Sequence, residues 1–235
     1  MDSVSLNDVD ITGNEQTGAL TGLINYGTID DCFVSGSVEG EKNSGGLVGD
    51  VRYRSVIHNC GADVTVIGEY NVGGFAGRLY HNDDNDNNKP LITNSYATGN
   101  AAASSRNVGG FVGWNVGLIS QCYATGNATC TNTTYSRVGG FAGAVAYCDG
   151  STGKIDNCFS LGDVQKGCGD DNITYGIGGF VGAFYSGGII TNCYSDGSFA
   201  LGSGNDNSGG FCGWFSSGTS EGNYYNEETS GFDDT

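Results

Sequence analysis

The sequence predicts an all-β fold, a right-handed parallel β-helix (a solenoid) of about seven coils, with three short strands per coil and loop insertions. Three observations lead to this prediction. A glycine motif recurs along the chain, further columns of residues recur in register with it, and the composition favours strands over helices. A repeat of this size cannot bury its own apolar face, so neighbouring repeats must stack to build a core.

The glycine motif reads Gly-Gly, apolar, small apolar, Gly, and it occurs six times after a degenerate first copy, GALTG. We expect the motif to form one strand of each coil, with its first two glycines at a tight corner where a positive φ costs glycine nothing. Where two successive copies lie further apart in the sequence than the closest pair, we expect the additional residues to form loops. The copies begin at Gly18, Gly45, Gly73, Gly109, Gly139, Gly178 and Gly209.

A second landmark, an Asn-Cys-aromatic cluster, follows each glycine motif. We predict a second strand from the isoleucine three places before the cysteine through Asn-Cys-Tyr-Ala, and a third strand around a Val/Ala position six places after it. The Asn suits a left-handed corner, and stacked Asn side chains there can bond one another's amides. The phenylalanines of the glycine motif should stack in the interior: Phe75, Phe111, Phe141, Phe180 and Phe211, with Leu47.

The composition supports one elongated domain over residues 1–235. The 43 glycines do not recur at every third position, which excludes collagen. The single proline leaves the strand ladders intact, and 37% of the residues are hydrophobic. Tyr, Phe, Val and Ile suit strands, and runs of helix formers are missing.

The charge balance limits the partners. Nine Lys and Arg residues face 26 Asp and Glu residues, for a net charge of -17. Because nucleic acid and anionic lipid bind through Lys and Arg, we expect no nucleic-acid binding. No stretch approaches the roughly 20 apolar residues of a membrane span, so we expect no membrane insertion. The start lacks the features of a signal peptide, and repeats begin within the first twenty residues, so we expect a piece of a longer, extracellular chain.

The repeated residues resemble a known family. RVGGFAG at 137–143 and ISQCYATG at 119–126 are similar to the GLUG-motif repeat, and NYYNEETSG at 223–231 resembles the closing segment of such arrays. The tail departs from that segment, because Tyr224 replaces a Cys and Asn226 replaces a Trp. The resemblance implies a repeat stalk of bacterial or archaeal surface proteins, including adhesin-like chains and the non-catalytic part of some secreted IgA-cleaving metallopeptidases. It implies no catalytic residue.

An aromatic residue follows each cysteine position, and strand alternation places it on the opposite, outward face. Such a strip could stack on sugar rings or on a protein partner. Alternatively, the rings pack only on one another or under loops. The column consists of Phe33, Tyr96, Tyr123, Phe159, Tyr194 and Tyr225, and the candidate ligand-binding residues are Tyr96, Tyr123, Phe159 and Tyr194.

Nine cysteines raise the question of disulfides and metals. Five of them share one inward column, which Ser95 and Tyr224 also occupy, so we interpret that column as small buried core residues. Cys130 and Cys168 fall at similar places in consecutive coils and are a candidate disulfide. His58 beside Cys60 is the only close Cys/His pair, and no C-x-x-C occurs, so we expect no zinc site. The column consists of Cys32, Cys60, Cys122, Cys158 and Cys193.

Two further loop features carry candidate sites. The run NDDNDNN at 82–88 offers hard oxygen ligands, so Asp83, Asp84 and Asp86 are candidates for calcium, the one cofactor considered. The alternative is a solvated acidic loop. Three Asn-X-Thr sequons are candidate glycosylation sites: Asn127, Asn132 and Asn172.

The chain carries two histidines and no metalloprotease motif, so we expect no enzyme. The leading hypothesis is a non-catalytic extracellular repeat domain of a surface adhesin or stalk, which presents loops and an aromatic face to a glycan or a protein surface. A structural subunit of an extracellular filament, which self-associates end to end, is one alternative. An accessory region of a secreted hydrolase is another.

Overall fold

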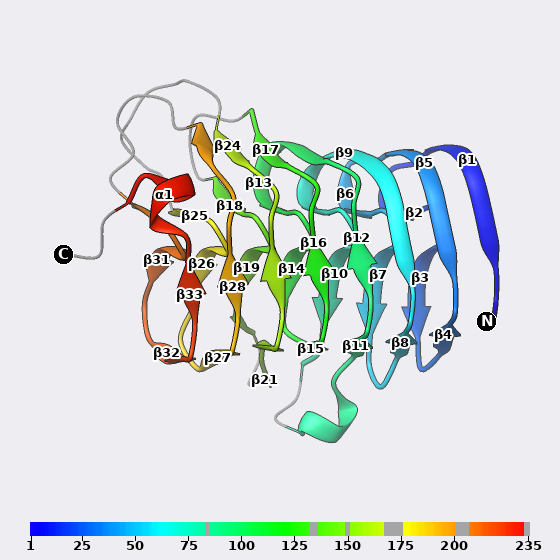
Figure 1. Ribbon diagram of the computed structural model, residues 1–235. Coiled ribbons are helices and arrows are strands. Elements are labelled where there is room, and N and C mark those ends of the chain that lie inside the picture. Colours follow the sequence, from blue (N-terminus) through cyan, green and yellow to red (C-terminus); the bar gives the residue numbers. More distant parts are fainter. Residues whose placement is uncertain (83–84, 132–135, 149–150, 167–175, 201–206, 233–235) are drawn as a thin grey trace.

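A computed structural model describes residues 1–82, 85–131, 136–148, 151–166, 176–200 and 207–232. The chain winds through seven coils that stack along one axis, with the termini at opposite ends (Figure 1). It rises along the front face of each coil, descends along the back and advances from the N-terminal end, so the winding is right-handed (Figure 1). The predicted parallel β-helix is confirmed.

Two of the three faces are seven-stranded parallel sheets, with one strand from each coil. The lower sheet contains β4 (Thr28–Asp30), β8 (Val56–His58), β11 (Leu91–Thr93), β15 (Leu118–Ser120), β22 (Lys154–Asp156), β27 (Gly188–Thr191) and β32 (Gly218–Glu221). The back sheet contains β3 (Thr21–Asn25), β7 (Val48–Arg52), β10 (Ala76–Tyr80), β14 (Val112–Asn115), β19 (Ala142–Val145), β26 (Val181–Phe184) and β31 (Cys212–Phe215).

The third face, the front sheet, has 17 parallel strands, because most coils contribute two or three strands to it. These strands are β1 (Ser5–Thr12), β2 (Glu15–Gly18), β5 (Phe33–Glu39), β6 (Lys42–Gly45), β9 (Gly61–Gly73), β12 (Tyr96–Ala97), β13 (Ala101–Gly109), β16 (Tyr123–Ala124), β17 (Ala128–Cys130), β18 (Arg137–Gly139), β23 (Phe159–Ser160), β24 (Val164–Lys166), β25 (Gly176–Gly178), β28 (Tyr194–Ser195), β29 (Phe199–Ala200), β30 (Ser208–Gly209) and β33 (Tyr224–Tyr225).

Three small elements lie outside these sheets. The 3-10 helix η1 (Asp86–Asn88) belongs to the insertion between β10 and β11, and a short antiparallel pair joins β20 (Tyr147–Cys148) to β21 (Ser151–Thr152). The helix α1 (Glu227–Ser230) follows the last strand. No helix of the described residues is long and apolar enough to cross a membrane.

The first two glycines of each motif lie at a corner, as predicted, but the predicted strand is shorter than expected, because it begins only at the fourth residue of the motif. In the third coil, β9 ends at Gly73 and β10 begins at Ala76. The reason for the glycines also differs from the expectation, because the left-handed glycines of the described residues do not include the first two of any motif. A Cβ on Gly74 would collide with the carbonyl oxygen of Gly110 in the next coil. Glycine is required here because neighbouring backbones touch.

The predicted Ile-Asn-Cys-Tyr-Ala strand is split in two at the asparagine. In the fourth coil, β11 and β12 flank Asn94, whose φ is 50°. The left-handed corner itself is confirmed in six coils, because short polar side chains tolerate this conformation. The residues at this corner are Asp31, Asn59, Asn94, Gln121, Asn157 and Asn192, with φ between 50° and 55°.

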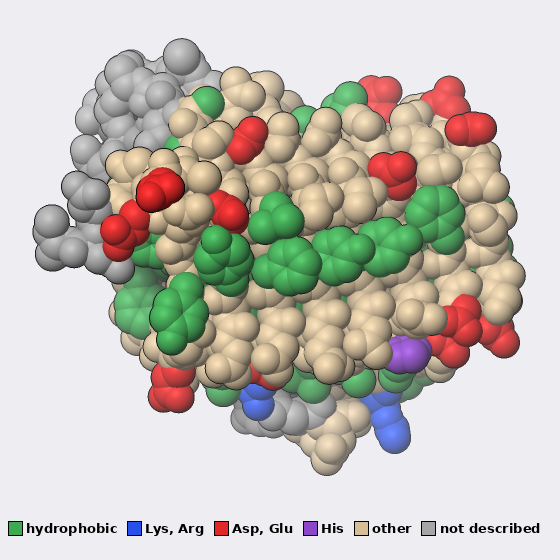
Figure 2. All heavy atoms as spheres, viewed as in Figure 1, with side chains coloured by type: hydrophobic (Ala, Val, Ile, Leu, Met, Phe, Trp, Pro, Cys, Tyr) green, Lys and Arg blue, Asp and Glu red, His purple; other side chains and the backbone are tan. Residues whose placement is uncertain are grey.

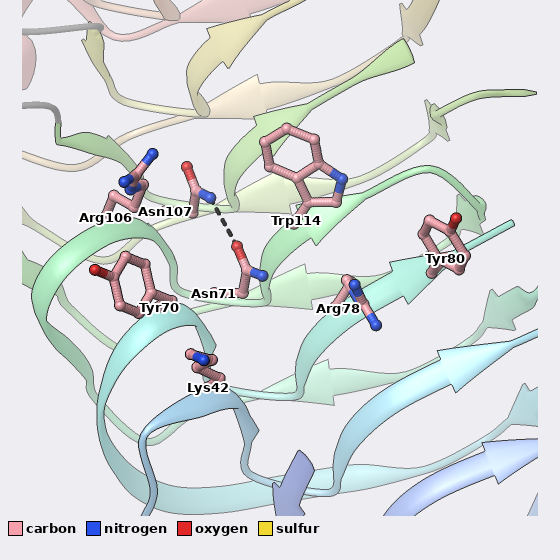
Figure 3. A pocket seen from close by; sticks show the side chains of 8 residues that line it. All are labelled: Lys42, Tyr70, Asn71, Arg78, Tyr80, Arg106, Asn107 and Trp114. Atoms are coloured by element: carbon pink, nitrogen blue, oxygen red, sulfur yellow. Dashed lines mark hydrogen bonds between the residues drawn. The ribbon is translucent and has the colours of Figure 1, made fainter. Parts of the chain in front are cut away.

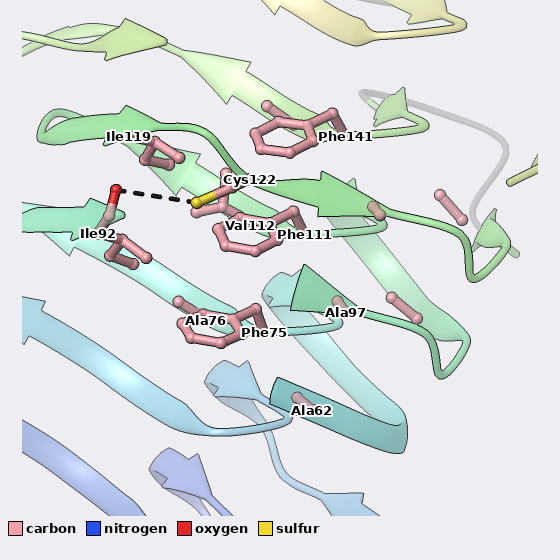
Figure 4. Close-up of a cluster of buried hydrophobic side chains, with 14 of the residues drawn as sticks. Ala62, Phe75, Ala76, Ile92, Ala97, Phe111, Val112, Ile119, Cys122 and Phe141 are labelled. Atoms are coloured by element: carbon pink, nitrogen blue, oxygen red, sulfur yellow. Dashed lines mark hydrogen bonds between the residues drawn. The ribbon is translucent and has the colours of Figure 1, made fainter. Parts of the chain in front are cut away.

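The core contains the predicted phenylalanine stack (Figure 4). Phe75, Phe111, Phe141 and Phe180 are fully buried, and their ring centroids lie 4.7 to 4.9 Å apart with nearly parallel planes. Small residues on the front sheet, such as Ala97, leave room for the rings. Burial of a phenylalanine side chain contributes about 2–3 kcal/mol, so this column stabilises each interface between coils.

The closing segment covers the C-terminal end of the stack. The ring of Tyr225 occupies the space above Gly210, where the next coil's glycine would otherwise lie. Asn226 accepts a hydrogen bond from the backbone of Glu228 and so caps α1, while Gly231 ends the helix with a left-handed φ of 69°. This segment is a terminal cap of the kind that repeat proteins require.

Candidate functional site

The predicted aromatic column crosses the outer surface of the front sheet, where Figure 2 shows a row of apolar side chains. The strand register places Tyr96, Tyr123, Phe159 and Tyr194 at one position of successive coils. The next member is Tyr224, which lies opposite Tyr194, so the assignment of Tyr225 to the column is wrong. Tyr225 points to the inner side because it follows Tyr224 on the same strand.

The rings of this column stack on one another. The centroids of Tyr96 and Tyr123 lie 5.3 Å apart, those of Tyr123 and Phe159 lie 5.0 Å apart, and the planes are within 8° of parallel. Gly61 interrupts the column, and the ring of Tyr96 lies over it. Because the ring faces cover each other, the surface presents ring edges and hydroxyl groups. That geometry suits contact with a flat partner surface better than face-on stacking of a sugar.

Two hydroxyl groups of this column, those of Tyr96 and Tyr194, have a raised pKa. Burial raises the pKa of Tyr96, with smaller contributions from Tyr123 and Asp63. Burial also raises the pKa of Tyr194, and the neighbouring Asp196 adds to the effect. The strip therefore offers neutral hydrogen-bond donors at physiological pH.

The five cysteines of the column lie in the core, as predicted, and they form hydrogen bonds. The assignment of Tyr224 to this column is wrong, because Tyr224 lies opposite Tyr194 on the outer face and is exposed. The backbone N–H of Cys32 donates to Sγ of Cys60 at 3.4 Å, and the thiol of Cys60 donates to the carbonyl of His58 at 3.1 Å. Ser95 takes the same position in the next coil, and its hydroxyl accepts from the N–H of Cys60 at 3.1 Å. Burial raises the pKa of Cys60 to about 12, so this thiol is not a nucleophile.

Several predicted sites lie wholly or partly outside the described residues. Asp83, Asp84, Asn132, Asn172 and Cys168 fall there, and so the calcium site, two sequons and the Cys130–Cys168 disulfide stay predictions. Of the calcium candidates, only Asp86 is placed, at the start of η1.

Cys130 and Asn127 are described. Cys130 is buried, and its thiol donates to the carbonyl of Ser105 at 3.3 Å. Asn127 is exposed at a coil corner, where its side-chain oxygen accepts from the backbone N–H of Asp163 at 2.9 Å. An exposed position is compatible with glycosylation.

The polar clusters of the described residues assemble no nucleophile with a base. His58 Nδ1 lies 2.8 Å from Asp30, and its Nε2 lies 3.0 Å from the amide of Asn94. The carboxylates of Asp2, Asp30 and Asp31 lie close enough to share a cation, but they are half-buried or exposed at the first coil. The absence of an enzyme activity stays a prediction.

A second left-handed corner was not predicted, and it carries an amide ladder. Asn71 donates to Asn43 and Asn107 donates to Asn71, each at 2.7 Å, and Arg137 donates to Asn107 at 2.8 Å. The predicted ladder at the other corner is interrupted: Asn59 donates to Asp31 of the preceding coil, but Asn94 bonds His58 instead of Asn59. The sequence signal was the Asn two places before the glycine motif in the second, third and fourth coils.

A groove lies beside this ladder, and its residues were also missed. It has a volume of about 430 Å³ and is lined by Lys42, Tyr70, Asn71, Arg78, Tyr80, Arg106, Asn107 and Trp114 (Figure 3). These residues come from three coils at irregular spacings. No motif therefore joins them in the sequence.

Comparison with known proteins supports the family resemblance. No curated protein and no solved structure matches this chain. The model of the GLUG motif matches residues 68–102 and 104–129. These two segments run from the end of β9 through β17, in the central coils of the stack. Residues 68–102 and 104–129 are thus GLUG motifs, in agreement with the resemblance.

Proposed function

We propose that this repeat domain is a non-catalytic, extracellular part of a surface adhesin or stalk. The observation that carries the proposal is the unbroken parallel stack of seven coils, in which every coil bonds the next on all three faces. With a spacing of about 4.8 Å between strands, the stack holds its ends about 35 Å apart. Such a rod is suited to project a binding surface, and surface proteins are where GLUG repeats are expected.

The aromatic column is the binding surface that we assign to this role. It forms a contiguous outward strip over successive coils, and Tyr224 and Phe159 are exposed at 69% and 38%. Exposed apolar strips of this kind mark contacts with other molecules. The stacked ring faces favour a flat glycan or protein surface as the partner.

The location is tested on cells of the organism that encodes the chain. An antibody against this domain should label intact cells, and a protease added outside should remove the signal. Labelling only after the cells are permeabilised would contradict the proposal. A binding defect in the variants Tyr123→Ala and Tyr194→Ala, measured on a glycan array and on host-cell extracts, would support the aromatic column.

A filament subunit is the second candidate. It is favoured by the first coil, where β1 to β4 each pair with a strand on one side only among the described residues. The cap formed by Tyr225 and α1 opposes growth at the other end. Size-exclusion chromatography and negative-stain images separate the two functions, since an adhesin fragment stays monomeric and a fibre subunit elongates. An accessory region of a secreted hydrolase requires a catalytic domain in the same reading frame.

A further inference from the structure

The groove that lies beside the amide ladder has two distinct walls and a polar floor (Figure 3). Lys42, Tyr70 and Arg106 pair in register on β6, β9 and β13 and form one wall. Arg78 and Trp114, paired on β10 and β14, form the other. The groove thus spans three consecutive coils along the corner between the front and back sheets.

A glycine of the repeat motif keeps the floor of the groove accessible. The amides of Asn71 and Asn107 lie between the walls, and each has a second N–H beyond the one used in the ladder. Gly113 packs so closely on the backbone of Asn71 that a Cβ would collide with it. The last glycine of the motif therefore keeps a side chain out of the space between the walls.

The arginine-lined part of the groove, around Arg78 and Arg106, carries excess positive charge in a protein of net charge -17. The buried carboxylate of Asp50 accepts hydrogen bonds from both Arg52 and Arg78, at 2.7 and 2.6 Å, so two guanidinium groups share one negative charge. Arg106 is exposed and stacks over the ring of Tyr70 at 5.3 Å. No carboxylate of the described residues pairs with Arg106. A ligand carboxylate can take that place with charge-assisted hydrogen bonds.

Aromatic rings supply the apolar part of the site. Trp114, Tyr70 and Tyr80 are all partly exposed in the groove, and the guanidinium of Arg78 lies 4.8 Å from the ring of Tyr80. In contrast to the outer aromatic column, the ring of Trp114 meets that of Tyr185 at a tilt of 41°, and no parallel ring from the described part of the chain covers its face. Aromatic surface with a few convergent polar groups is typical of small-ligand sites.

We propose that this groove binds a carboxylated sugar unit, with Arg106 on the carboxylate, Trp114 against the sugar ring and the Asn amides on its hydroxyl groups. A long polyanion is disfavoured, because Glu15, Glu41 and Glu69 surround Lys42 at one end of the groove. The volume of about 430 Å³ accommodates one or two pyranose rings. The proposal concerns a different face from the aromatic column and does not depend on cellular location.

The test is an NMR titration of the protein with disaccharides that end in glucuronic, galacturonic or sialic acid, each beside its neutral counterpart. We expect at least one acidic sugar to shift the indole N–H signal of Trp114 and to bind about tenfold more tightly than the neutral form, the contribution of a charged hydrogen bond. Arg106→Gln should remove most of that preference. Arg54→Gln, an exposed arginine outside the groove, is the matched control and should leave binding unchanged.

Three results of the sugar titrations would overturn the proposal. These are the absence of binding by all three acidic sugars, equal binding of acidic and neutral forms, and equal losses in the Arg106 and Arg54 variants. Tighter binding of a pentaglutamate peptide than of any sugar would assign the groove to an acidic protein segment instead. Unchanged melting temperatures verify that both variants fold. The antibody labelling of intact cells, which tests the proposed function, does not depend on any of these results.

Discussion

Glycine and asparagine recur in the coils for two different structural reasons. Gly74 is needed because the carbonyl of Gly110 occupies the space of a side chain, whereas Asn94 is needed because the backbone turns with a positive φ. Both residue types are usually read as turn formers. At the glycine position, the close approach of two backbones excludes a side chain. At the asparagine position, the positive φ limits the choice to residues that tolerate a left-handed backbone.

The inner and outer aromatic columns have the same stacking geometry and different burial, so their contributions to stability should differ. Phe141→Ala removes a fully buried ring between two others and should cost about 3–5 kcal/mol, because a cavity remains in the core. Tyr123→Ala, at a half-buried outer position, should cost about 1 kcal/mol. Urea unfolding followed by circular dichroism measures both. Equal losses would contradict the assignment of the core.

At the scale of elements, one carboxylate of the stack holds side chains of the C-terminal cap, in addition to the packing of Tyr225 on Gly210. Asp196 accepts hydrogen bonds from Asn226 and Thr229, each at 2.8 Å. These bonds, the one from Thr229 first, lower the pKa of Asp196 below its ordinary value. Because the pKa is lower in the folded state, the carboxylate stabilises the cap at pH values above the pKa of Asp in the unfolded state. This contribution is lost as the pH falls through the pKa of Asp196 in the folded state.

We therefore predict that acid releases the cap before it unfolds the core. Amide exchange at Ser230 and Gly231, whose N–H groups bond within α1, should accelerate as the pH falls below about 4, relative to intrinsic rates. In Asp196→Ala the same amides should exchange rapidly at all pH values. Amides of β14 serve as the internal control. Unchanged protection in the variant would show that Asp196 does not hold the cap.

At the scale of the whole molecule, each coil packs only on its neighbours, so stability should vary along the stack. The first strand, β1, has no buried residue, whereas β14 and β19 in the middle are almost entirely buried. We predict that native-state hydrogen exchange is slowest in β14 and β19 and faster in β1 to β4. Uniform protection from end to end would indicate one global unfolding unit instead.

The sequence determined the repeat, its direction of stacking and its inner columns. Equivalent letters at a recurring spacing place Phe111 above Phe75 and Cys158 beyond Cys122, because only stacked coils can bury such columns. The left-handed Asn corner was predictable for the same local reason. These features depend on backbone conformation and on the period of the chain.

The tertiary structure decided which contacts cross between coils. It shortened the strand of the glycine motif, split the Ile-Asn-Cys-Tyr strand, moved Tyr225 from the surface to the cap and joined Arg106 to Trp114 across one groove. None of these follows from local pattern, because each depends on the distance between backbones that lie about 30 residues apart in the chain. The repeat period determines which residues lie above one another, and the packing of successive coils determines which of their atoms are in contact.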